Sequence, residues 1–394
     1  MPPAPPKPLV IGFTGENANG ALAAGTQYLN WVFSTYGMEA QQINLFDADW
    51  VGRLRALVEE RTPLFCYGHA GVGAGLRNDN RSFWTDYKVP FFSLMYDHPF
   101  CNLPNHTIDS PYVAACYFIG DFLEARLNFV RQPGRAYAMR DSFVASDAPN
   151  KTWMQREIPY LLVKTGYNPA RLMPALEALS AAERAIFDAC LSLLQGSADY
   201  NLTLLAAEHC RAAGIETHDG DARFVRIVLL LERYMRDWRG SQLVEWLKHK
   251  DAVIVGDGWD FIDKTDAKAR FLPSMPVHDY WPLNGNSRFV FNANPYFRDG
   301  CHERVLAGLQ CGAVAVTDRN RFSDNVFADM GNFVGFDWNA GWRERLDARI
   351  TEIEAKGGGF DADGARQHLA AAFPAEAFVV RFLTAAKEIR QSAG

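Results

Sequence analysis

The segment 292–318, NANPYFRDGCHERVLAGLQCGAVAVTD, contains residue types that suit a site for a phosphate group. An apolar strand leads into a polar loop that contains Gly300, and a short helix is predicted to begin near His302. The unpaired backbone N–H groups and the positive dipole end at such a helix start suit a diphosphate. Arg304 can add a charge-assisted bond, and Glu303 is an acceptor that matches the two hydroxyls of a ribose. The alternative is that Glu303 only complements the helix dipole and that Arg304 is a solvated surface charge.

A second loop with ligand-binding character follows the apolar run 252–255. It reads Gly256-Asp257-Gly258-Trp259. Glycines let a ligand approach the backbone closely, because they carry no side chain. The indole of Trp259 could stack on a nucleotide base. A core tryptophan beside a tight turn is the alternative interpretation of the same pattern.

Two further polar positions follow predicted strands in the first half of the chain. Gly15 comes after the strand 9–13, and Asp97 and His98 come after the strand 89–96. Ligands of parallel sheets bind outside the carboxyl ends of the strands, so these residues are candidates for a site. A histidine with an ordinary pKa of about 6.5 can act as an acid or a base. The alternative is that Asp97 caps a turn and His98 packs within a loop.

A competing motif is Gly71-Val72-Gly73-Ala74-Gly75, which resembles a dinucleotide-binding fingerprint. The match is imperfect, because Leu76 stands where the third glycine or alanine belongs. The fingerprint is also expected after the first strand, whereas this motif follows the third. An NAD-dependent oxidoreductase is therefore kept as an alternative function.

The sequence indicates neither a metal site nor a disulfide framework. Asp47-Ala48-Asp49 matches the pattern of a metal-binding DxD motif, but it stands at the start of a predicted helix and is interpreted as an N-cap. The seven cysteines are an odd number and include no CxxC pair, so free thiols in a reducing cytoplasm are expected. We expect no metal, no bound cofactor and a cytoplasmic location.

The elements that must position these residues alternate between strands and helices. Residues 1–150 alternate throughout, which predicts a parallel sheet covered on both faces by helices. Alternation returns in 151–375, interrupted by an almost wholly helical insertion at about 169–250. A final helix, 376–394, is expected to pack back towards the N-terminal domain. A chain of 394 residues exceeds the size at which a single core stops growing, so two domains are expected.

The charge balance limits the classes of partner. There are 46 acidic and 40 basic residues, a net charge of −6, whereas a protein that binds nucleic acid normally carries a basic excess. Nucleic acid is therefore not expected as a partner. No apolar run approaches the length of about 20 residues that spans a bilayer, so no integral membrane segment is expected.

Three segments of the second half resemble the C-terminal donor domain of a group-1-like glycosyltransferase family that includes spore-maturation and cell-surface enzymes. That family reads G-x-G-W, then S-K-x-x-L-N, then H-E-R-x-F-E-A-M-A-C-G-A. The matching segments here are Gly256–Trp259, Ser287–Asn292 and 300–313. His278-Asp279-Tyr280 fits more loosely. The sequence departs from the family pattern at Ala307, where many relatives carry glutamate. This difference removes one acidic residue that would contact the sugar donor.

The resemblance implies the GT-B fold, an α/β architecture of two Rossmann-like domains whose parallel sheets face a central cleft. The C-terminal domain would hold a nucleotide-diphosphate sugar as co-substrate, without metal, and the N-terminal domain would hold a polysaccharide, glycan or protein acceptor. Asp97 and His98 would be the catalytic residues. The residues implied to bind the nucleotide sugar are Gly15, Gly256, Gly258, Trp259, His278, Tyr280, Asn294, Gly300, His302, Glu303 and Arg304. A non-catalytic nucleotide-sugar or glycan binder of the same fold is an alternative, which Ala307 favours.

Overall fold

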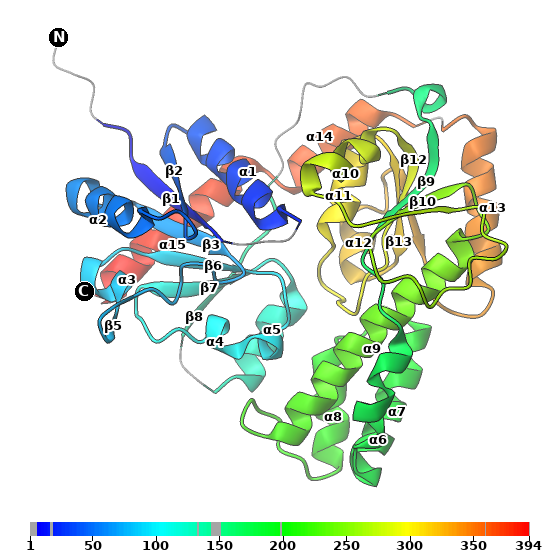
Figure 1. Ribbon diagram of the computed structural model, residues 1–394, viewed down its shortest axis with the longest axis horizontal. Coiled ribbons are helices and arrows are strands. Elements are labelled where there is room, and N and C mark those ends of the chain that lie inside the picture. The colour runs from blue at the N-terminus through cyan, green and yellow to red at the C-terminus, as the bar shows by residue number, and fades with distance from the viewer. Residues whose placement is uncertain are drawn as a thin grey trace. The chain divides into compact units, whose positions relative to one another are not determined.

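The chain folds into two compact units in the computed structural model, which describes residues 6–15, 19–131, 134–142, 151–197, 199–358 and 360–393. Unit 1 comprises Met1–Val144 and Phe373–Gly394, and unit 2 comprises Ala145–Ala372 (Figure 1). The boundary predicted after residue 150 lies beside residues 143–150, which are outside the described ranges. Each unit contains one six-stranded sheet, and neighbouring strands within each of these sheets run parallel.

The sheet of unit 1 has the spatial order β2-β1-β3-β6-β7-β8. Its strands are β1 (Leu9–Thr14), β2 (Glu39–Asn44), β3 (Phe65–His69), β6 (Phe91–Met95), β7 (Val113–Tyr117) and β8 (Arg135–Ala138). The strands β3, β6 and β7 are buried throughout, as expected of a parallel sheet covered on both faces. The helices of this unit are α1 (Ala21–Thr35), α2 (Trp50–Arg61), α3 (Phe83–Tyr87), α4 (Leu103–His106), α5 (Gly120–Phe129) and α15 (Ala375–Ala393).

The last helix of the chain, α15, is part of the core of unit 1. The ring of Phe382 lies 5.5 Å from that of Phe33 on α1, 5.4 Å from that of Phe65 on β3 and 5.0 Å from that of Phe92 on β6. Near its end, Arg390 donates to the carbonyl of Pro63. The C-terminal helix therefore covers one face of the sheet that the N-terminal residues build.

The sheet of unit 2 has the spatial order β11-β10-β9-β12-β13-β14. Its strands are β9 (Ile158–Val163), β10 (Ala252–Val255), β11 (Arg270–Leu272), β12 (Ser287–Phe291), β13 (Val314–Asp318) and β14 (Phe333–Phe336). The helices that follow β11, β12, β13 and β14 are α10 (Val277–Gly285), α11 (Glu303–Gln310), α12 (Arg321–Val326), and α13 (Trp342–Ala355) with α14 (Ala362–Ala372). The α/β class with two parallel sheets that the sequence predicts is confirmed.

A helical arm stands between β9 and β10. It consists of α6 (Met173–Glu177), α7 (Ala181–Gly196), α8 (Leu202–Ala212) and α9 (Ala222–Leu247), and extends away from the sheet of unit 2 in Figure 1. Ser180 and Glu183 form a capping box at the start of α7, and Asn201 caps α8. The end of α9 returns to the sheet, where Leu243 and Leu247 are buried in its core.

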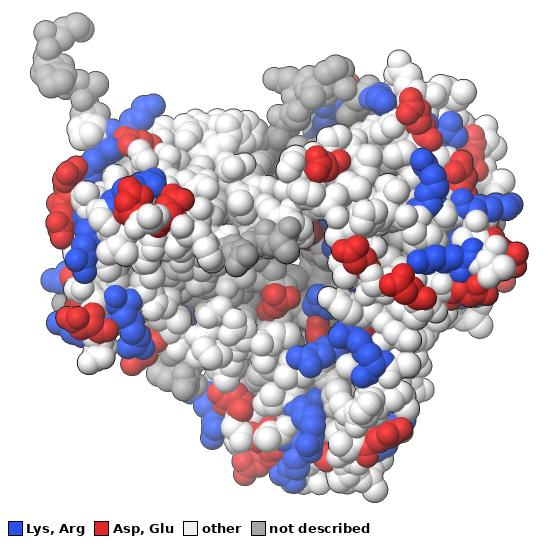
Figure 2. All heavy atoms as spheres, in the orientation of Figure 1, with Lys and Arg blue, Asp and Glu red and all other residues white. Residues whose placement is uncertain are grey.

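Acidic and basic side chains are interspersed over the drawn face of both units (Figure 2). This agrees with the nearly balanced composition of 46 acidic and 40 basic residues. None of the helices within the described ranges combines the length and apolarity needed to cross a bilayer.

Candidate functional site

The carboxyl ends of the central strands of unit 2 carry the polar residues that could bind a ligand. Lys164 directly follows β9, Gly256 directly follows β10, and the loop after β12 leads to α11. Because β10, β9 and β12 are neighbours in the sheet, these segments meet at one edge. In open α/β sheets this edge is where ligands bind.

The start of α11 presents an ionised carboxylate. His302 is the N-cap residue, and its Nδ1 lies 2.5 Å from Oε2 of Glu303 and 3.5 Å from the backbone nitrogen of Arg304. The Glu303 side chain is 65% exposed. Burial acts to raise the pKa of Glu303, but His302 and Arg304 outweigh it and lower the pKa to about 2. Glu303 is therefore a permanent acceptor beside the positive end of a helix.

Three cations converge beside this helix start. Burial, together with the nearby charges of Arg304 and Arg236, lowers the pKa of Lys164 to about 7, against the opposing effect of Asp237 and Glu232. Like charges held close together repel one another unless an anion lies among them. Arg236 pairs with Glu232 over 2.5 Å. Within the cluster of Lys164, Arg236 and Arg304, it is therefore Lys164 and Arg304 that suit an anion.

The aliphatic stem of Lys164 lies against α9 at Gly240. A Cβ atom at Gly240 would come within 2.5 Å of Cε of Lys164. The missing side chain thus makes room for the lysine. Sequence reasoning overlooked both Lys164 and Arg236; the signal that could have found the lysine is its place directly after a buried strand.

The glycine-rich loop after β10 packs against the loop that carries Lys164. Cβ atoms at Gly256 and Gly258 would come within 2.2 Å of the carbonyl oxygens of Lys164 and Gly166. Trp259 is buried, and its Nε1 donates to the carbonyl of Lys164 over 2.9 Å. These residues therefore support the loop that carries Lys164. The prediction that Trp259 stacks on a nucleotide base is wrong, because Gly166 covers the indole ring.

Tyr280 joins Glu303 and Arg304 in a shallow cleft. The cleft has a volume of about 10 Å³ and is lined by Val163, Tyr280, Trp281, Asn284, Val290, Glu303, Arg304 and Ala307. Burial raises the pKa of the Tyr280 hydroxyl, and the charge of Glu303 raises it further. Of the predicted donor residues, the structure thus brings together Tyr280, Glu303 and Arg304.

Three other predicted residues of unit 2 lie outside this cleft. The side chain of His278 is exposed and its Nε2 lies 3.3 Å from Asp279. Asn294 is buried and donates to the carbonyl of Phe297 over 2.9 Å. Gly300 is buried, and its carbonyl accepts from Asn320 over 2.9 Å. Asn294 and Gly300 shape the loop before α11.

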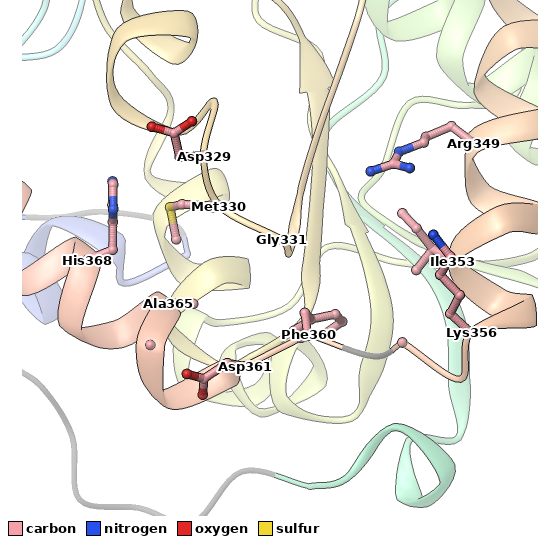
Figure 3. A pocket seen from close by; sticks show the side chains of 12 residues that line it. Asp329, Met330, Gly331, Arg349, Ile353, Lys356, Phe360, Asp361, Ala365 and His368 are labelled. Atoms are coloured by element: carbon pink, nitrogen blue, oxygen red, sulfur yellow. The ribbon is translucent and has the colours of Figure 1, made fainter.

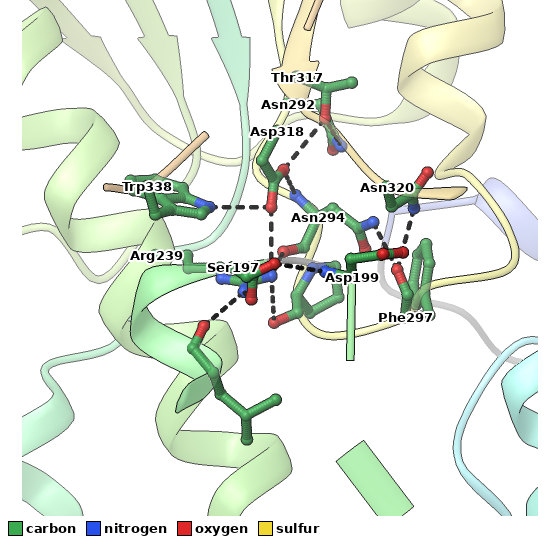
Figure 4. Close-up of polar contacts among 12 residues, drawn as sticks. Ser197, Asp199, Arg239, Asn292, Asn294, Phe297, Thr317, Asp318, Asn320 and Trp338 are labelled. Carbon is green, nitrogen blue, oxygen red and sulfur yellow. Dashed lines mark hydrogen bonds and ion pairs between the residues drawn. The ribbon is translucent and has the colours of Figure 1, made fainter. Parts of the chain in front are cut away.

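A buried ionic network holds that loop in place (Figure 4). Asp318, at the end of β13, accepts from the backbone N–H of Asn294 over 2.5 Å and from Nε1 of Trp338 over 2.9 Å. Arg239 on α9 lies 3.2 Å from the same carboxylate and donates to the carbonyl of Asn294 over 2.9 Å. The guanidinium also donates to the carbonyl of Ser197, just after α7, over 2.8 Å. The network therefore ties the helical arm and β13 to the loop that leads to α11.

The remaining predicted residues, Gly15, Asp97 and His98, belong to unit 1. Gly15 follows β1, and Asp97 is exposed beyond the end of β6. His98 is buried between Phe100 and Phe122, and its Nδ1 accepts the backbone N–H of Phe100 over 3.2 Å. Burial lowers the pKa of His98 to about 3. His98 therefore packs within a loop, as the alternative interpretation of the sequence had it. A buried histidine of this kind does not support acid–base catalysis.

The dinucleotide-like motif does not open a helix. The residues after β3 form a turn in which Gly71 and Gly73 have φ angles of +81° and +85°. A hairpin of β4 (Arg77–Asn78) and β5 (Arg81–Ser82) follows. A dinucleotide fingerprint requires a helix start at this point, so the NAD-dependent alternative loses its basis.

The described ranges contain no evident metal centre. No group of three or more His, Cys, Asp or Glu side chains in them is placed to hold a metal ion. Asp49 is the N-cap residue of α2, as predicted, although no side-chain bond caps the helix. Asp47 pairs with Arg53 over 3.0 Å.

A larger cavity lies elsewhere in unit 2, beside the start of β14. Its volume is about 370 Å³. Arg349, Ile353 and Lys356 enter it from α13 and the residues just after it, and Ala365 and His368 from α14 (Figure 3). The cavity lies at the amino end of the strand, whereas Lys164 and α11 lie at the carboxyl edge. It is therefore separate from the candidate site.

Comparisons with known proteins agree with this arrangement. Residues 236–372 match the family model described as "Glycosyl transferase-like". This segment of unit 2 is therefore similar to that family. The matched segment contains Gly240, Glu303 and Arg304. No curated protein matches the sequence.

Solved glycosyltransferase structures share the fold of the whole chain. An alpha-glucosyltransferase in complex with UDP and a 13-mer DNA containing a central A:G mismatch matches with a TM-score of 0.54 and 10% identity, over 95% of this chain and 99% of that one. An alpha-glucosyltransferase in complex with UDP-glucose and DNA containing an abasic site matches with a TM-score of 0.52 and 11% identity, over the same shares of the two chains. The expected GT-B fold is confirmed. The narrower resemblance to spore-maturation enzymes finds no support in these matches.

Proposed function

We propose that this chain is a glycosyltransferase that moves a sugar from a nucleotide-diphosphate donor, bound by unit 2, to a glycan or protein acceptor, bound by unit 1. The observation that carries the proposal is the convergence of Lys164, Arg236 and Arg304 at the start of α11. The positive dipole end of α11 and these cations form a site of the kind that binds a diphosphate. The domain match over residues 236–372 supports the same function.

In this mechanism the protein stabilises the departing diphosphate electrostatically. Negative charge grows on the diphosphate as its bond to the sugar breaks. The cationic cluster and the dipole of α11 are already oriented towards that charge, so the reaction pays little reorganisation energy. Glu303, ionised at every physiological pH, accepts hydroxyl hydrogen bonds from the donor.

Asp97 remains the candidate in unit 1 for accepting the proton of the acceptor hydroxyl. It is exposed just beyond the end of β6, at the carboxyl edge of the sheet. Because His98 is buried, the proposal assigns this role to Asp97 alone. Replacement by asparagine, Asp97→Asn, should lower sugar transfer by about 100-fold or more without changing nucleotide affinity, because a positioned base is lost.

The proposal does not invoke a metal ion, because the three cations can supply the positive charge that a metal supplies in other transferases. Sugar transfer should therefore survive chelation by EDTA. Turnover that disappears in EDTA and returns with manganese would contradict this part of the proposal.

The decisive experiment is a thermal-shift screen of the purified chain against UDP, GDP, ADP and their sugars. A ligand at 100 times its Kd should add about 2.7 kcal/mol of stability. Lys164→Met should abolish the shift. The matched control is Lys356→Met, since Lys356 lines the larger cavity at the other edge of the sheet. A shift lost in the control and retained in Lys164→Met would place the nucleotide in that cavity and overturn the proposed site.

A further inference from the structure

The segment that follows β9 is fastened to one face of α9 at two points. At its start, Lys164 lies against Gly240, where an added Cβ would come within 2.5 Å of the lysine Cε. Further along the segment, Nε and Nη2 of Arg171 both lie 3.0 Å from Oδ2 of Asp237. Asp237 and Gly240 stand at positions i and i+3 of the helix, so they are neighbours on one face. Lys164 and Asp237 therefore meet on the same face of α9.

Asp237 is a buried carboxylate that is held by a partner at the surface. Its side chain is 1% exposed, whereas that of Arg171 is 45% exposed. The guanidinium of Arg171 also lies over the ring of Tyr167 in the same segment, with its Cζ 4.2 Å from the ring centroid. Burial raises the pKa of Asp237, and the charges of Arg171 and Lys164 oppose this rise. A carboxylate removed from water stays ionised only if cations compensate it, and these two cations do so.

The charged and titratable groups around the ammonium of Lys164 come from two helices. They are Arg304 and His302 at the start of α11, and Arg236, Asp237 and Glu232 on α9. Of the two carboxylates, Asp237 has the larger effect in favour of the charged lysine. Glu232 shares its charge with Arg236, which lies 2.5 Å away. Asp237 is therefore the main group that offsets the repulsion of Lys164 by the neighbouring cations.

We propose that Asp237 is a positioning residue of the donor site, which fastens the segment that begins with Lys164 to α9 and keeps this lysine charged for the diphosphate. The inference rests on the proposed transferase function. Asp237 acts through Lys164 and through Arg171, without contact with the donor. This role accounts for a buried carboxylate beside a site for an anion, where its own charge would repel the ligand.

The first test measures the titration of Lys164 in the free chain, so it does not depend on a nucleotide. NMR of the chain with ¹³C-labelled lysine reports the pKa of Lys164, whose signal is assigned by its loss in Lys164→Met. Asp237→Asn should lower that pKa by about one pH unit, because the opposite charge beside the ammonium is removed. Asp237→Glu keeps the charge and should restore the pKa. The control is Asp188→Asn, which breaks an exposed pair with Arg184 on α7 and should leave the pKa unchanged.

The second test measures the affinity of the same variants for UDP, GDP and ADP by calorimetry at pH 6 and pH 8. A diphosphate binds the charged form of Lys164, and a lower pKa makes this form scarcer. Asp237→Asn should therefore bind about twofold more weakly at pH 6 and about tenfold more weakly at pH 8. A carboxylate that only repelled the ligand would give the opposite sign, because its removal would strengthen binding at both pH values.

Asp237→Asn should fold, because asparagine has the size of aspartate and still accepts a bond from Arg171. If melting curves show otherwise, the ¹³C carboxyl signal of Asp237 in the unmodified chain decides: an ionised group at pH 7 supports the proposal, and a neutral acid overturns it.

The outcomes separate this inference from the proposed function. An unshifted pKa of Lys164 in Asp237→Asn, or an equal shift in Asp188→Asn, overturns the role of Asp237. Stronger nucleotide binding by Asp237→Asn at both pH values also overturns it. A shifted pKa in a chain that binds none of the three nucleotides supports the effect of Asp237 on Lys164 and contradicts the donor site.

Discussion

Arg239 and Asp318 form an ion pair in which neither side chain is exposed. Their closest atoms are 3.2 Å apart, and Arg239 joins α9 to the end of β13. Burial raises the pKa of Asp318 and lowers that of Arg239, whereas each partner opposes the shift of the other. Two charges removed from water in this way are stable only as a pair, so each depends on its partner.

Removing one partner of this pair should destabilise the protein strongly. Asp318→Ala leaves the guanidinium of Arg239 buried without its counter-charge, which costs about 3–5 kcal/mol in the free energy of unfolding. Denaturant titration measures the loss. The control is Asp324→Ala, which breaks an exposed pair with Arg319 and should cost about 0–1 kcal/mol. Equal losses in the two variants would contradict the importance of the buried network.

Adding one methyl group at Gly240 should disturb the donor site while leaving the fold intact. The new Cβ would approach Cε of Lys164, the mobile part of that side chain, so the lysine can move away at little cost. Gly240→Ala should therefore lower nucleotide affinity about tenfold, as expected for a misplaced charge-assisted bond. Calorimetric titration provides the measurement. Gly196→Ala, at a helical glycine with no atom within 4 Å of the new Cβ, is the control and should bind normally.

Nucleotide affinity should fall as the pH rises above about 7. The pKa of Lys164 is lowered to about 7, so in the free protein this side chain loses its proton at alkaline pH. A bound diphosphate favours the charged form, so binding at pH 8–9 must take up a proton and is weakened by at most tenfold per pH unit. Lys164→Met should bind weakly and show no such slope. An unchanged slope in this variant would assign the titration to another group.

Neutralising Glu303 should weaken donor binding selectively. Glu303→Gln keeps the shape of the side chain but turns one acceptor oxygen into a donor, and we expect a loss of about 1–3 kcal/mol in binding free energy. The melting temperature should change little, because the side chain is 65% exposed. A calorimetric affinity equal to that of the unmodified chain would return Glu303 to a capping role.

Unit 1 should lose stability in mild acid. Burial lowers the pKa values of His69, His98 and His106 to about 4, 3 and 4. In the unfolded chain these histidines take up protons near pH 6.5, so between pH 6.5 and 4 the unfolded state binds more protons than the folded state. The stability that the neutral histidines provide is complete above pH 6.5 and is lost as the pH falls. Thermal melts at pH 7.5, 6 and 5 should show the decline, and His98→Gln should flatten it.

Much of the fold follows from local sequence patterns. A continuous apolar run predicted the strand β10 with its observed bounds, and similar runs predicted most of the other long strands within two or three residues at each end. The bounds of β2 were also predicted, although that strand is largely polar. Such runs are informative because a strand buried on both faces has no polar side to present. Several elements were missed, because they carry no comparable run: β11, the β4–β5 hairpin, the short helices α10 and α12, and the 14-residue helix α13. Their positions depend on neighbours that are distant in the sequence.

The sequence also indicated which segments could carry chemistry. The helix start at His302 was predicted from the glycine loop before it and the apolar helix after it, and it is the N-cap of α11. Residue type alone, however, did not distinguish Trp259 as a packing residue from Trp259 as a ligand for a base. The choice depends on Gly166, whose contact with the indole brings together the loops after β9 and β10.

Tertiary structure decided which charged groups lie together. Lys164, Arg236 and Arg304 are separated by 72 and 68 positions in the chain (236 − 164 and 304 − 236), and no local pattern relates them. They converge because β9, β12 and the middle of α9 meet at one edge of a parallel sheet. By the same folding, Asp97 remained exposed while its neighbour His98 became buried against Phe122. Side-chain type sets which chemistry a residue can perform, whereas its pKa and its access to a ligand depend on burial and neighbouring charges, which only the folded chain determines.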